Sequence, residues 1–247
     1  MLKLLHISKS FPTKPILDDV SITFEPQRIY ALMGANGAGK TTLFNILTGF
    51  LKADKGSIVF KNKNIHQILP FRINRLGISR TFQDLRLVTK LTVKENVILA
   101  MQDNPTDVWY KALIPLSIYA RKTKILADKA EDLLKKYFLA DVQHHLAGEI
   151  SYGQQKLLTL VCCIANGADF LLLDEPVAGI NPEYRQKMVG LLHTLRTEGK
   201  TIVMIEHNTE FIQAVADTLI FLSEGKLLQY IDFQAFKADA RVIESYI

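Results

Sequence analysis

One stretch near the N-terminus, GANGAGKTT at residues 34–42, limits the possible folds of this chain more than any other. Residues 28–33 (RIYALM) precede it directly and have the length and apolar character of a strand, and apolar residues recur at helical spacing over residues 43–51. A strand, a glycine-rich turn and a helix in this order are the context that the phosphate-binding pattern G-x-x-x-x-G-K-[ST] requires. The stretch therefore predicts an α/β fold with a nucleotide site.

The residue types in this loop suit contact with phosphate groups. Glycines let consecutive backbone N–H groups point at phosphate oxygens, and the N-terminus of the following helix adds the positive end of its dipole. We expect Lys40 to reach the β- and γ-phosphates and the Thr41 hydroxyl to ligate Mg²⁺. The alternative is a glycine turn with a surface lysine. The other residues predicted to contact the nucleotide here are Gly34, Asn36, Gly37, Gly39 and Thr42.

The length of the chain allows one large α/β domain, or a core with a subdomain. With 247 residues it can bury a sizeable core. No apolar run approaches the roughly 18 residues that a membrane span needs. The N-terminus lacks the apolar segment and cleavage site of a signal peptide. These features predict a soluble protein.

Charge and cysteine content exclude little by themselves. A formal charge of +5 permits nucleic acid, an anionic membrane surface or phosphate ligands as partners. The densest basic cluster, RKTK at residues 121–124, is expected to be a solvated face. The two cysteines, Cys162 and Cys163, are adjacent and therefore poorly placed for a disulfide or a metal, so we expect buried small side chains in a reducing compartment.

The N-terminal third predicts a second, smaller sheet. Residues 2–8, 20–24 and 56–60 are rich in β-formers, which favours a small antiparallel sheet beside the nucleotide core. Phe11 is expected in the loop between the first two of these strands. A loop aromatic usually contributes to packing, but one shortly upstream of a phosphate loop can stack on an adenine ring.

The pattern becomes helical from about residue 84 to residue 160. Residues 93–101, 125–138 and 154–164 show helical spacing, whereas residues 103–124 are irregular and contain two prolines and the only tryptophan. We expect a helical subdomain inserted into the nucleotide-binding core.

The core resumes with two strands joined by a helix. An apolar strand at residues 170–173 and a second at residues 201–205 flank a helix with one apolar face, so the strands should be parallel. Their carboxyl ends would then lie at the sheet edge that carries the phosphate loop, where open α/β sheets bind ligands. Residues 219–230 predict a hairpin and residues 239–247 a terminal helix.

Three polar side chains follow these two strands. Asp174 ends the first strand, where it can hold Mg²⁺ opposite Thr41, and Glu175 can orient and deprotonate a water aimed at the γ-phosphate. The alternative is two solvated charges that end a strand. His207 follows the second strand and is a candidate γ-phosphate contact, although a lone histidine is more often packed or at the surface.

Together these residues resemble the ATP-binding-cassette (ABC) ATPases over essentially the whole chain, as one domain of residues 1–247. SYGQQ at residues 151–155 is similar to the family signature, which usually reads Leu-Ser-Gly-Gly-Gln. Tyr152 replaces the first signature glycine, and the residue before the motif is Ile150 instead of leucine. Ser151, Gly153 and Gln154 are kept, so the resemblance implies a phosphate contact from the N-terminus of a helix.

The resemblance also implies roles for residues that would otherwise be ordinary. Gln83 matches the family's glutamine loop, which senses Mg²⁺ and the attacking water; His207 matches the switch histidine and Phe11 the adenine-stacking aromatic. Asn181 stands where many members have an aspartate, so the communication between paired sites stays open. The implied fold is a P-loop NTPase fold of the ABC ATPase type, with a RecA-like core, an antiparallel β subdomain and the inserted helical subdomain.

Longer stretches resemble the ATPase of high-affinity branched-chain amino-acid importers. Bacterial urea and amide importers use the same subfamily, and the lipopolysaccharide-export ATPase is a cousin, so the cargo stays open. The stretches are SRTFQ at residues 79–83, LTVKENV at 91–97, EPVAGINP at 175–182 and RVIESY at 241–246.

The resemblance implies an ATP-hydrolysing importer subunit on the cytoplasmic face of the membrane, bound to separate membrane-spanning permease subunits. Two copies, or this chain and a paralogue, would sandwich two ATP, with Ser151 acting on the neighbour's ATP. Residues 85–93 would form part of the groove that receives the membrane partner. Non-transport cassette proteins that act on nucleic acid or ribosomes usually carry coiled coils, two cassettes or zinc modules. This sequence has no sustained heptad run, one phosphate loop and no spaced cysteines, so no nucleic acid is expected as a partner. An intact Glu175 and His207 argue against a silent binding module.

Overall fold

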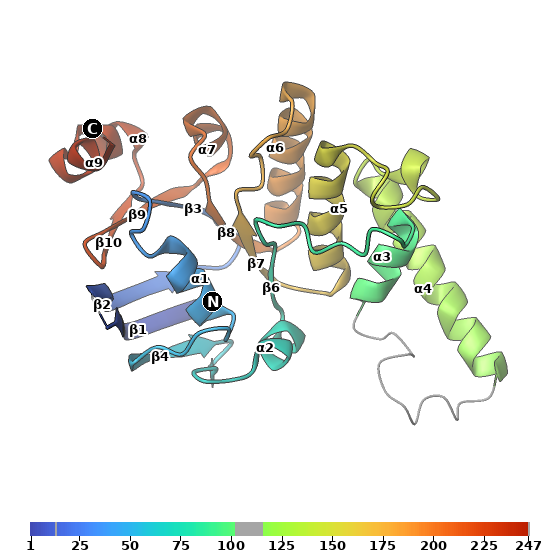
Figure 1. Cartoon of the computed structure of the whole chain (residues 1–247), viewed down its shortest axis with the longest axis horizontal. Helices are drawn as coiled ribbons and strands as arrows, with labels where there is room; N and C mark the ends of the chain where they lie inside the picture. Colours follow the sequence, from blue (N-terminus) through green and yellow to red (C-terminus); the bar gives the residue numbers. More distant parts are fainter. Residues whose placement is uncertain (13, 102–115, 247) are drawn as a thin grey trace.

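A six-stranded sheet forms the centre of the molecule in the computed structural model, which describes residues 1–12, 14–101 and 116–246 (Figure 1). Its strand order is β10-β9-β3-β8-β7-β6, and all neighbours are parallel except β9 and β10. The predicted βαβ unit and C-terminal hairpin are both present. The strands are β3 (Ile29–Met33), β6 (Ile78–Arg80), β7 (Phe170–Asp174), β8 (Thr201–Ile205), β9 (Thr218–Ser223) and β10 (Lys226–Tyr230).

The central strands β3, β7 and β8 are buried at every position, because both faces of this sheet are covered, and they are almost entirely apolar. Alternate residues of β3 enter two different cores: Ile29, Ala31 and Met33 face one, and Tyr30 and Leu32 face the other. The first core is completed by the helices of residues 93–100, 116–136, 152–165, 182–197, 209–215, 233–238 and 240–246. The second is completed by the helix of residues 40–47 and by the antiparallel sheet.

The antiparallel sheet has the strand order β2-β1-β4-β5 (β1, Leu2–Phe11; β2, Lys14–Phe24; β4, Lys55–Phe60; β5, Lys63–Asn64). The predicted loop position of Phe11 is wrong, because Phe11 is the last residue of β1 and pairs with Lys14. Register shifts follow Leu4 in β1, and His6 and Asp19 both have φ of 54°. These bulges break the alternation of side chains, so the hydrophobic pattern ends before the strand does.

The remaining core helices flank the two sheets. α1 follows the phosphate loop, and α6 connects β7 to β8. α2, α7 and α8 are short helices that the sequence did not predict. The helices are α1 (Lys40–Leu47), α2 (Pro70–Leu76), α6 (Pro182–Thr197), α7 (Thr209–Val215), α8 (Phe233–Ala238) and α9 (Ala240–Tyr246).

A helical segment lies between β6 and β7, on the side of the molecule opposite α9 (Figure 1). It contains α3 (Val93–Ala100), α4 (Leu116–Lys136), a 3₁₀ turn (Ala140–Val142) and α5 (Tyr152–Ala165). In these described residues the only strand-like pairing is a single bridge between Thr92 and Leu146. The segment thus occupies the position expected for an inserted helical subdomain.

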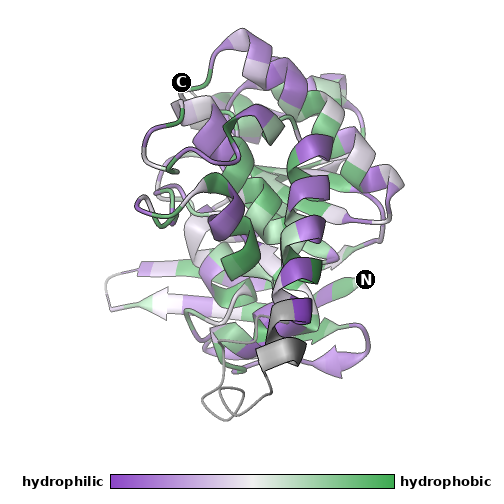
Figure 2. Ribbon diagram, turned by 90° about the vertical axis from the view of Figure 1, so that its right-hand side faces the viewer, coloured by the Kyte–Doolittle hydropathy of each residue, from purple (hydrophilic) through white to green (hydrophobic). Residues whose placement is uncertain are grey.

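Helix α4 begins earlier than the sequence indicated. Residues 116–124 were predicted to be irregular but are helical, whereas the prolines and tryptophan of residues 102–115 lie outside the described residues. Residues 121–125 are all exposed, and Leu126, Ala130 and Leu134 form a buried stripe along the rest of the helix. The outward side of α4 is accordingly hydrophilic, including the basic cluster at 121–124 (Figure 2).

Two further features bear on the predictions from composition. Within the described ranges, none of the helices combines the length and the apolar character that crossing a membrane requires. Cys162 and Cys163 are free thiols in α5, and burial raises the pKa of the Cys163 thiol to about 11. Such a thiol is chemically unreactive near neutral pH and acts as a small packing group.

Candidate active site

A cavity of about 340 Å³ lies at the carboxyl edge of the central sheet, beside the phosphate loop. Segments from the N-terminal sheet, the phosphate loop, the end of β6 and the ends of β7 and β8 meet there. Most of the residues predicted to act on a nucleotide line it: Phe11, Asn36, Gly37, Gly39, Lys40, Thr41, Thr42, Gln83, Asp174, Glu175 and His207.

The phosphate loop requires glycine at two points for steric reasons. Gly34 has φ of 150°, and a Cβ there would lie 2.4 Å from the carbonyl oxygen of Leu222 in β9. Gly39 precedes α1 in the left-handed region with φ of 107°, and its Cβ would lie 2.6 Å from Cγ2 of Ile16. Both positions therefore exclude larger residues without moving the loop or its neighbours.

Lys40 presents a desolvated cation at the centre of this loop. It is only 8% exposed, and its Nζ donates to the carbonyl oxygens of Gly34 at 2.6 Å and Ala35 at 2.9 Å. Burial lowers the pKa of the Lys40 ammonium, while the carboxylates of Glu175 and Asp174 act in the opposite direction. A charged group held this way interacts strongly with anions because little water screens it.

The Asp174 carboxylate is held by an arginine that the sequence analysis did not single out. Arg80 Nη2 donates to Asp174 Oδ2 at 2.7 Å, and Arg80 Nη1 donates to Asn45 Oδ1 in α1 at 2.6 Å. The Arg80 and Asp174 side chains are 4% and 9% exposed. The backbone N–H of Asp174 donates to Thr81 Oγ1 at 3.0 Å. These contacts leave Asp174 little freedom to turn away from the cavity.

Glu175 has an unusual backbone conformation for a residue other than glycine, with φ of 49°. Its N–H donates to the Ile205 carbonyl at 3.0 Å, and its own carbonyl accepts from Lys156 Nζ at 3.1 Å. Gln83 Nε2 lies 3.5 Å from Glu175 Oε2, so the two side chains that were predicted to handle the attacking water are neighbours. The sequence did not identify Lys156 as a contact of Glu175, because Lys156 belongs to no recognisable motif.

The signature residues lie elsewhere. Ser151 caps α5, since its Oγ accepts from Gln154 N–H at 3.4 Å and the Gln154 side chain accepts from Ser151 N–H at 2.9 Å. The helix starts at Tyr152, two residues before the predicted start. Gly153 packs against Tyr184 of α6, where a Cβ would lie 2.9 Å from the ring. None of the three residues that match the signature, Ser151, Gly153 and Gln154, lines the cavity of the same chain.

The donor set in the cavity fits Mg²⁺. Thr41, Gln83 and Asp174, which all carry side-chain oxygen atoms, line the same cavity. Mg²⁺ prefers oxygen ligands, commonly one or two carboxylates together with substrate phosphates. Among the described residues no group of three His, Cys, Asp or Glu side chains is placed to hold a metal alone. The arrangement therefore suits an ion that shares its ligands with a nucleotide.

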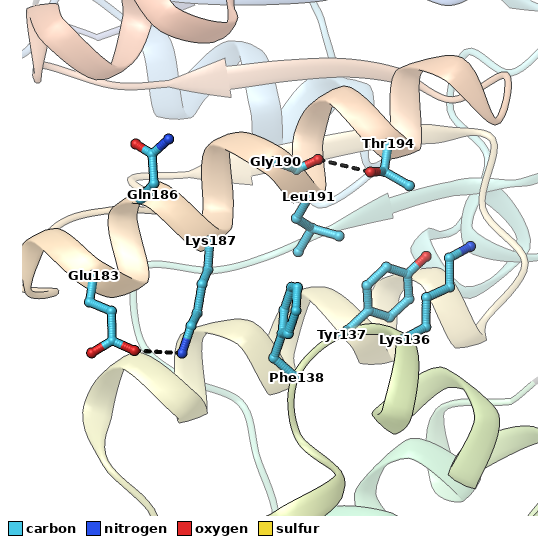
Figure 3. Close-up of a pocket in the computed structure, with 9 residues that line it drawn as sticks. All are labelled: Lys136, Tyr137, Phe138, Glu183, Gln186, Lys187, Gly190, Leu191 and Thr194. Carbon is cyan, nitrogen blue, oxygen red and sulfur yellow. Dashed lines mark hydrogen bonds and ion pairs between the residues drawn. The ribbon is translucent and has the colours of Figure 1, made fainter.

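A larger cavity, of about 620 Å³, lies between the end of α4 and α6 and is lined by Tyr137, Phe138 and Leu191 (Figure 3). Its charged groups are engaged: Lys187 Nζ pairs with Glu183 at 2.7 Å, and Lys136 pairs with Glu198. It contains no glycine-rich loop and no acidic side chain that is free of a basic partner to serve as a catalytic base. The chemistry therefore belongs to the smaller cavity.

A groove of about 310 Å³ lies next to the site, between the segment after β6 and helices α3 and α5. The Phe82 ring is covered by Arg86, whose Cζ lies 3.5 Å from the ring centre, and meets the Phe50 ring edge-on at 5.7 Å. Val88 and Leu99 line the groove and are 42% and 49% exposed. Leu87 lines it too but also packs against the core.

Known proteins share both the sequence and the fold of this chain. A family model described as "ABC transporter" matches residues 17–178. The high-affinity branched-chain amino acid transport ATP-binding protein LivG of Escherichia coli (strain K12) is 31% identical over 232 residues, covering 94% of this chain and 91% of the relative. A probable branched-chain amino acid transport ATP-binding protein LivG of Methanocaldococcus jannaschii is 31% identical, covering 100% and 97%. The crystal structure of a nucleotide-free ATP-binding cassette from an ABC transporter has a TM-score of 0.85 and 30% identity, covering 100% of this chain and 98% of the other.

Proposed function

This chain belongs to the ABC transporter family, and from that membership we propose that it is the ATP-hydrolysing subunit of an importer. The observation that carries the proposal is the convergence of Lys40, Asp174, Glu175 and His207 on one cavity at the carboxyl edge of the sheet. These residues come from separate segments, and together they supply a phosphate-binding cation, a metal ligand, a base and a second γ-phosphate contact.

Each residue has a distinct part in hydrolysis. The loop N–H groups and Lys40 bind the β- and γ-phosphates of ATP, and Phe11 stacks on the adenine ring. Glu175, supported by Gln83, orients a water and accepts its proton as the oxygen attacks the γ-phosphorus and the bond to ADP breaks. His207 contacts the γ-phosphate. Thr41, Gln83 and Asp174 would hold Mg²⁺, which when bound neutralises charge on the phosphates.

The signature residues Ser151, Gly153 and Gln154 are proposed to complete the site of a second ATPase subunit. Their position outside the cavity of their own chain supports this assignment. Ser151 stands at the N-terminus of the 14-residue helix α5, a position that favours anions. The second subunit is another copy of this chain or a paralogue.

The membrane-spanning permease subunits are proposed to bind the groove beside the site. Two exposed apolar side chains line this groove. Val88 lies five residues after Gln83, and Leu99 lies in α3. Such a groove accepts an apolar segment of a partner. The chain would act as a peripheral protein on the cytoplasmic face of the membrane, without a role in nucleic-acid binding.

Branched-chain amino acids are the proposed cargo, because the relatives that cover most of this chain are named for their transport. The alternatives are a urea or amide importer and a lipopolysaccharide exporter. Identification of the genes that neighbour this one would distinguish them, since the membrane and binding subunits select the solute.

The decisive test of the ATPase proposal compares two variants of the purified chain. Lys40→Ala should weaken ATP binding, because Lys40 contacts phosphates in the ground state. Glu175→Gln should keep ATP binding but lower turnover by at least about 100-fold, because it removes only the base. The matched control is Glu183→Gln in α6, which should hydrolyse ATP like the wild type. Undiminished turnover in Glu175→Gln protein would disprove the assignment.

A further inference from the structure

A buried carboxylate with no assigned role lies directly behind the active site. Glu206 follows β8, precedes His207 and is 3% exposed. Its Oε1 accepts from the backbone N–H of Val177 at 3.0 Å. Its Oε2 accepts from the backbone N–H groups of His207 at 2.8 Å and Asn208 at 3.1 Å. Three main-chain donors therefore converge on one side chain.

The burial of this charge is not explained by an ion pair. In the described parts of the chain no Lys, Arg or His side chain forms a salt bridge with Glu206. A buried carboxylate that is compensated only by backbone donors is costly compared with an apolar residue at the end of an apolar strand. The stability of the strand therefore does not explain a glutamate at this position. The location of Glu206 between two functional loops does explain it.

The three donors belong to the two loops that carry the proposed base and the γ-phosphate contact. Val177 lies two residues after Glu175, and His207 is itself one of the bonded residues. β7 and β8 pair in parallel with Asp174 opposite Ile205, so the loops start side by side. The carboxylate spans the gap between them and fixes their relative position after the strand pairing has ended.

Only a carboxylate satisfies these contacts fully. Both of its oxygens accept hydrogen bonds, whereas the amide of a glutamine of the same size offers one accepting oxygen and one NH₂ donor. Glu206→Gln would place that NH₂ against the Val177 N–H or against the His207 and Asn208 N–H groups. One loop would then lose its attachment while the volume of the side chain stays the same.

We propose that Glu206 is a positioning residue that holds the Glu175 loop and the His207 loop in register for attack of water on the γ-phosphate. The inference rests on the proposed ATPase function and adds to it a residue that touches neither the nucleotide nor the reacting water. Among the described residues no hydrogen bond or ion pair joins Glu206 to Lys40 or to the phosphate loop, so we expect ATP binding to be separate from this device.

The test measures ATP affinity and turnover of the purified full-length chain. Glu206→Gln should lower kcat by about 10- to 100-fold, because displacement of reacting groups by roughly 1 Å has effects of that size. The Kd for ATP should change by less than about threefold, because the phosphate contacts of Lys40 and of the loop N–H groups are kept. The control is Glu210→Gln, four residues along the chain, whose side chain is 87% exposed and which should behave like the wild type.

A double variant separates positioning from general damage. If Glu206 acts partly through His207, the losses in kcat from Glu206→Gln and His207→Ala should combine to less than their product, whereas independent effects multiply. Glu206→Asp keeps both accepting oxygens on a shorter side chain and provides the same measurements if the glutamine variant does not fold. Wild-type kcat in either variant, parallel loss of kcat and ATP affinity, or multiplying effects would overturn the inference. Absence of hydrolysis in the wild type and in Glu210→Gln would overturn the proposed function itself.

Discussion

The guanidinium of Arg80 joins three parts of the molecule at the level of single side chains. It bonds Asp174 at the end of β7 and Asn45 in α1, and its Cζ lies 4.9 Å from the centre of the Phe82 ring. Both members of the Arg80–Asp174 pair are almost completely buried. Because neither can be rehydrated in place, removal of one leaves the other uncompensated.

Arg80→Met should therefore lower the free energy of unfolding by about 3–5 kcal/mol, the usual cost of breaking a buried pair. Denaturant unfolding followed by fluorescence or circular dichroism measures this difference. The control is Lys187→Met, which breaks a pair at the surface between Lys187 and Glu183 and should have little effect. Equal stability of the two variants would show that the buried pair contributes nothing to the fold.

The sequence predicted residues that line the candidate nucleotide site but not the residues that hold them. Lys40 and Glu175 stand in patterns whose chemistry depends on spacing along the chain. Arg80, Lys156 and Glu206 act through contacts with residues 94, 19 and 29 positions away, to Asp174, Glu175 and Val177. No local pattern encodes such contacts, so only the folded structure identifies them.

Among the elements, those with regular burial were predicted well. β3, β7 and β8 are buried at every position, and α6 presents one apolar face, so their periodicity is clear. The errors fall where burial is irregular. Bulges in β1 interrupt the alternation and concealed the end of that strand, and residues 121–125 of α4 are all exposed, so they show no apolar periodicity.

The groove beside the site depends on how α3 holds the preceding segment. Asn96 of α3 is buried, accepts from Val88 N–H at 2.9 Å and donates to the Val88 carbonyl at 3.1 Å. Val88 is thus fixed by its backbone while its side chain remains exposed. Residues 85–93, which include Leu87 and Val88, were expected to form the docking groove, but Leu87 packs against the core, so a charge at Leu87 would destabilise the fold.

Charge substitutions at Val88 and Leu99 should separate docking from hydrolysis. Val88→Asp combined with Leu99→Asp should leave the ATPase of the isolated chain unchanged within about twofold, because both side chains are already solvated. Co-purification with the membrane subunits should be lost. Ile231→Asp provides the control, because Ile231 is 83% exposed and lies outside the groove. Full recovery of the membrane complex with the double variant would contradict the docking assignment.

At the scale of the whole molecule, the fold separates the two surfaces that the proposed two-subunit site would bring together. The phosphate loop, Glu175 and His207 converge on the edge of the core sheet, whereas Ser151 caps a helix of the inserted segment outside that cavity. One chain alone therefore presents a nucleotide site without its signature residues. A second subunit that faces this edge with its own α5 would supply them.

Mixed dimers test this arrangement directly. A chain with Lys40→Ala and a chain with Ser151→Arg should each be inactive as homodimers, because every site then contains one defect. In a mixed dimer both defects fall in one site if Ser151 acts on the partner's ATP, and the other site is intact. Mixing the two inactive proteins should therefore restore ATPase activity, toward half of the wild-type activity per mixed dimer.

The control mixture combines Lys40→Ala with Glu175→Gln, two defects that belong to the same surface of the core. Each site of that mixed dimer keeps one defect, so no activity should return whichever chain supplies the signature. Mixed pairing is verified with ATP by co-purification of the second chain through an affinity tag on the first, since the comparison is informative only when mixed dimers form. Mixed dimers of the Lys40→Ala and Ser151→Arg chains that remain inactive would show that Ser151 serves its own chain. The helical segment would then have to move so that Ser151 reaches the nucleotide site of the same molecule.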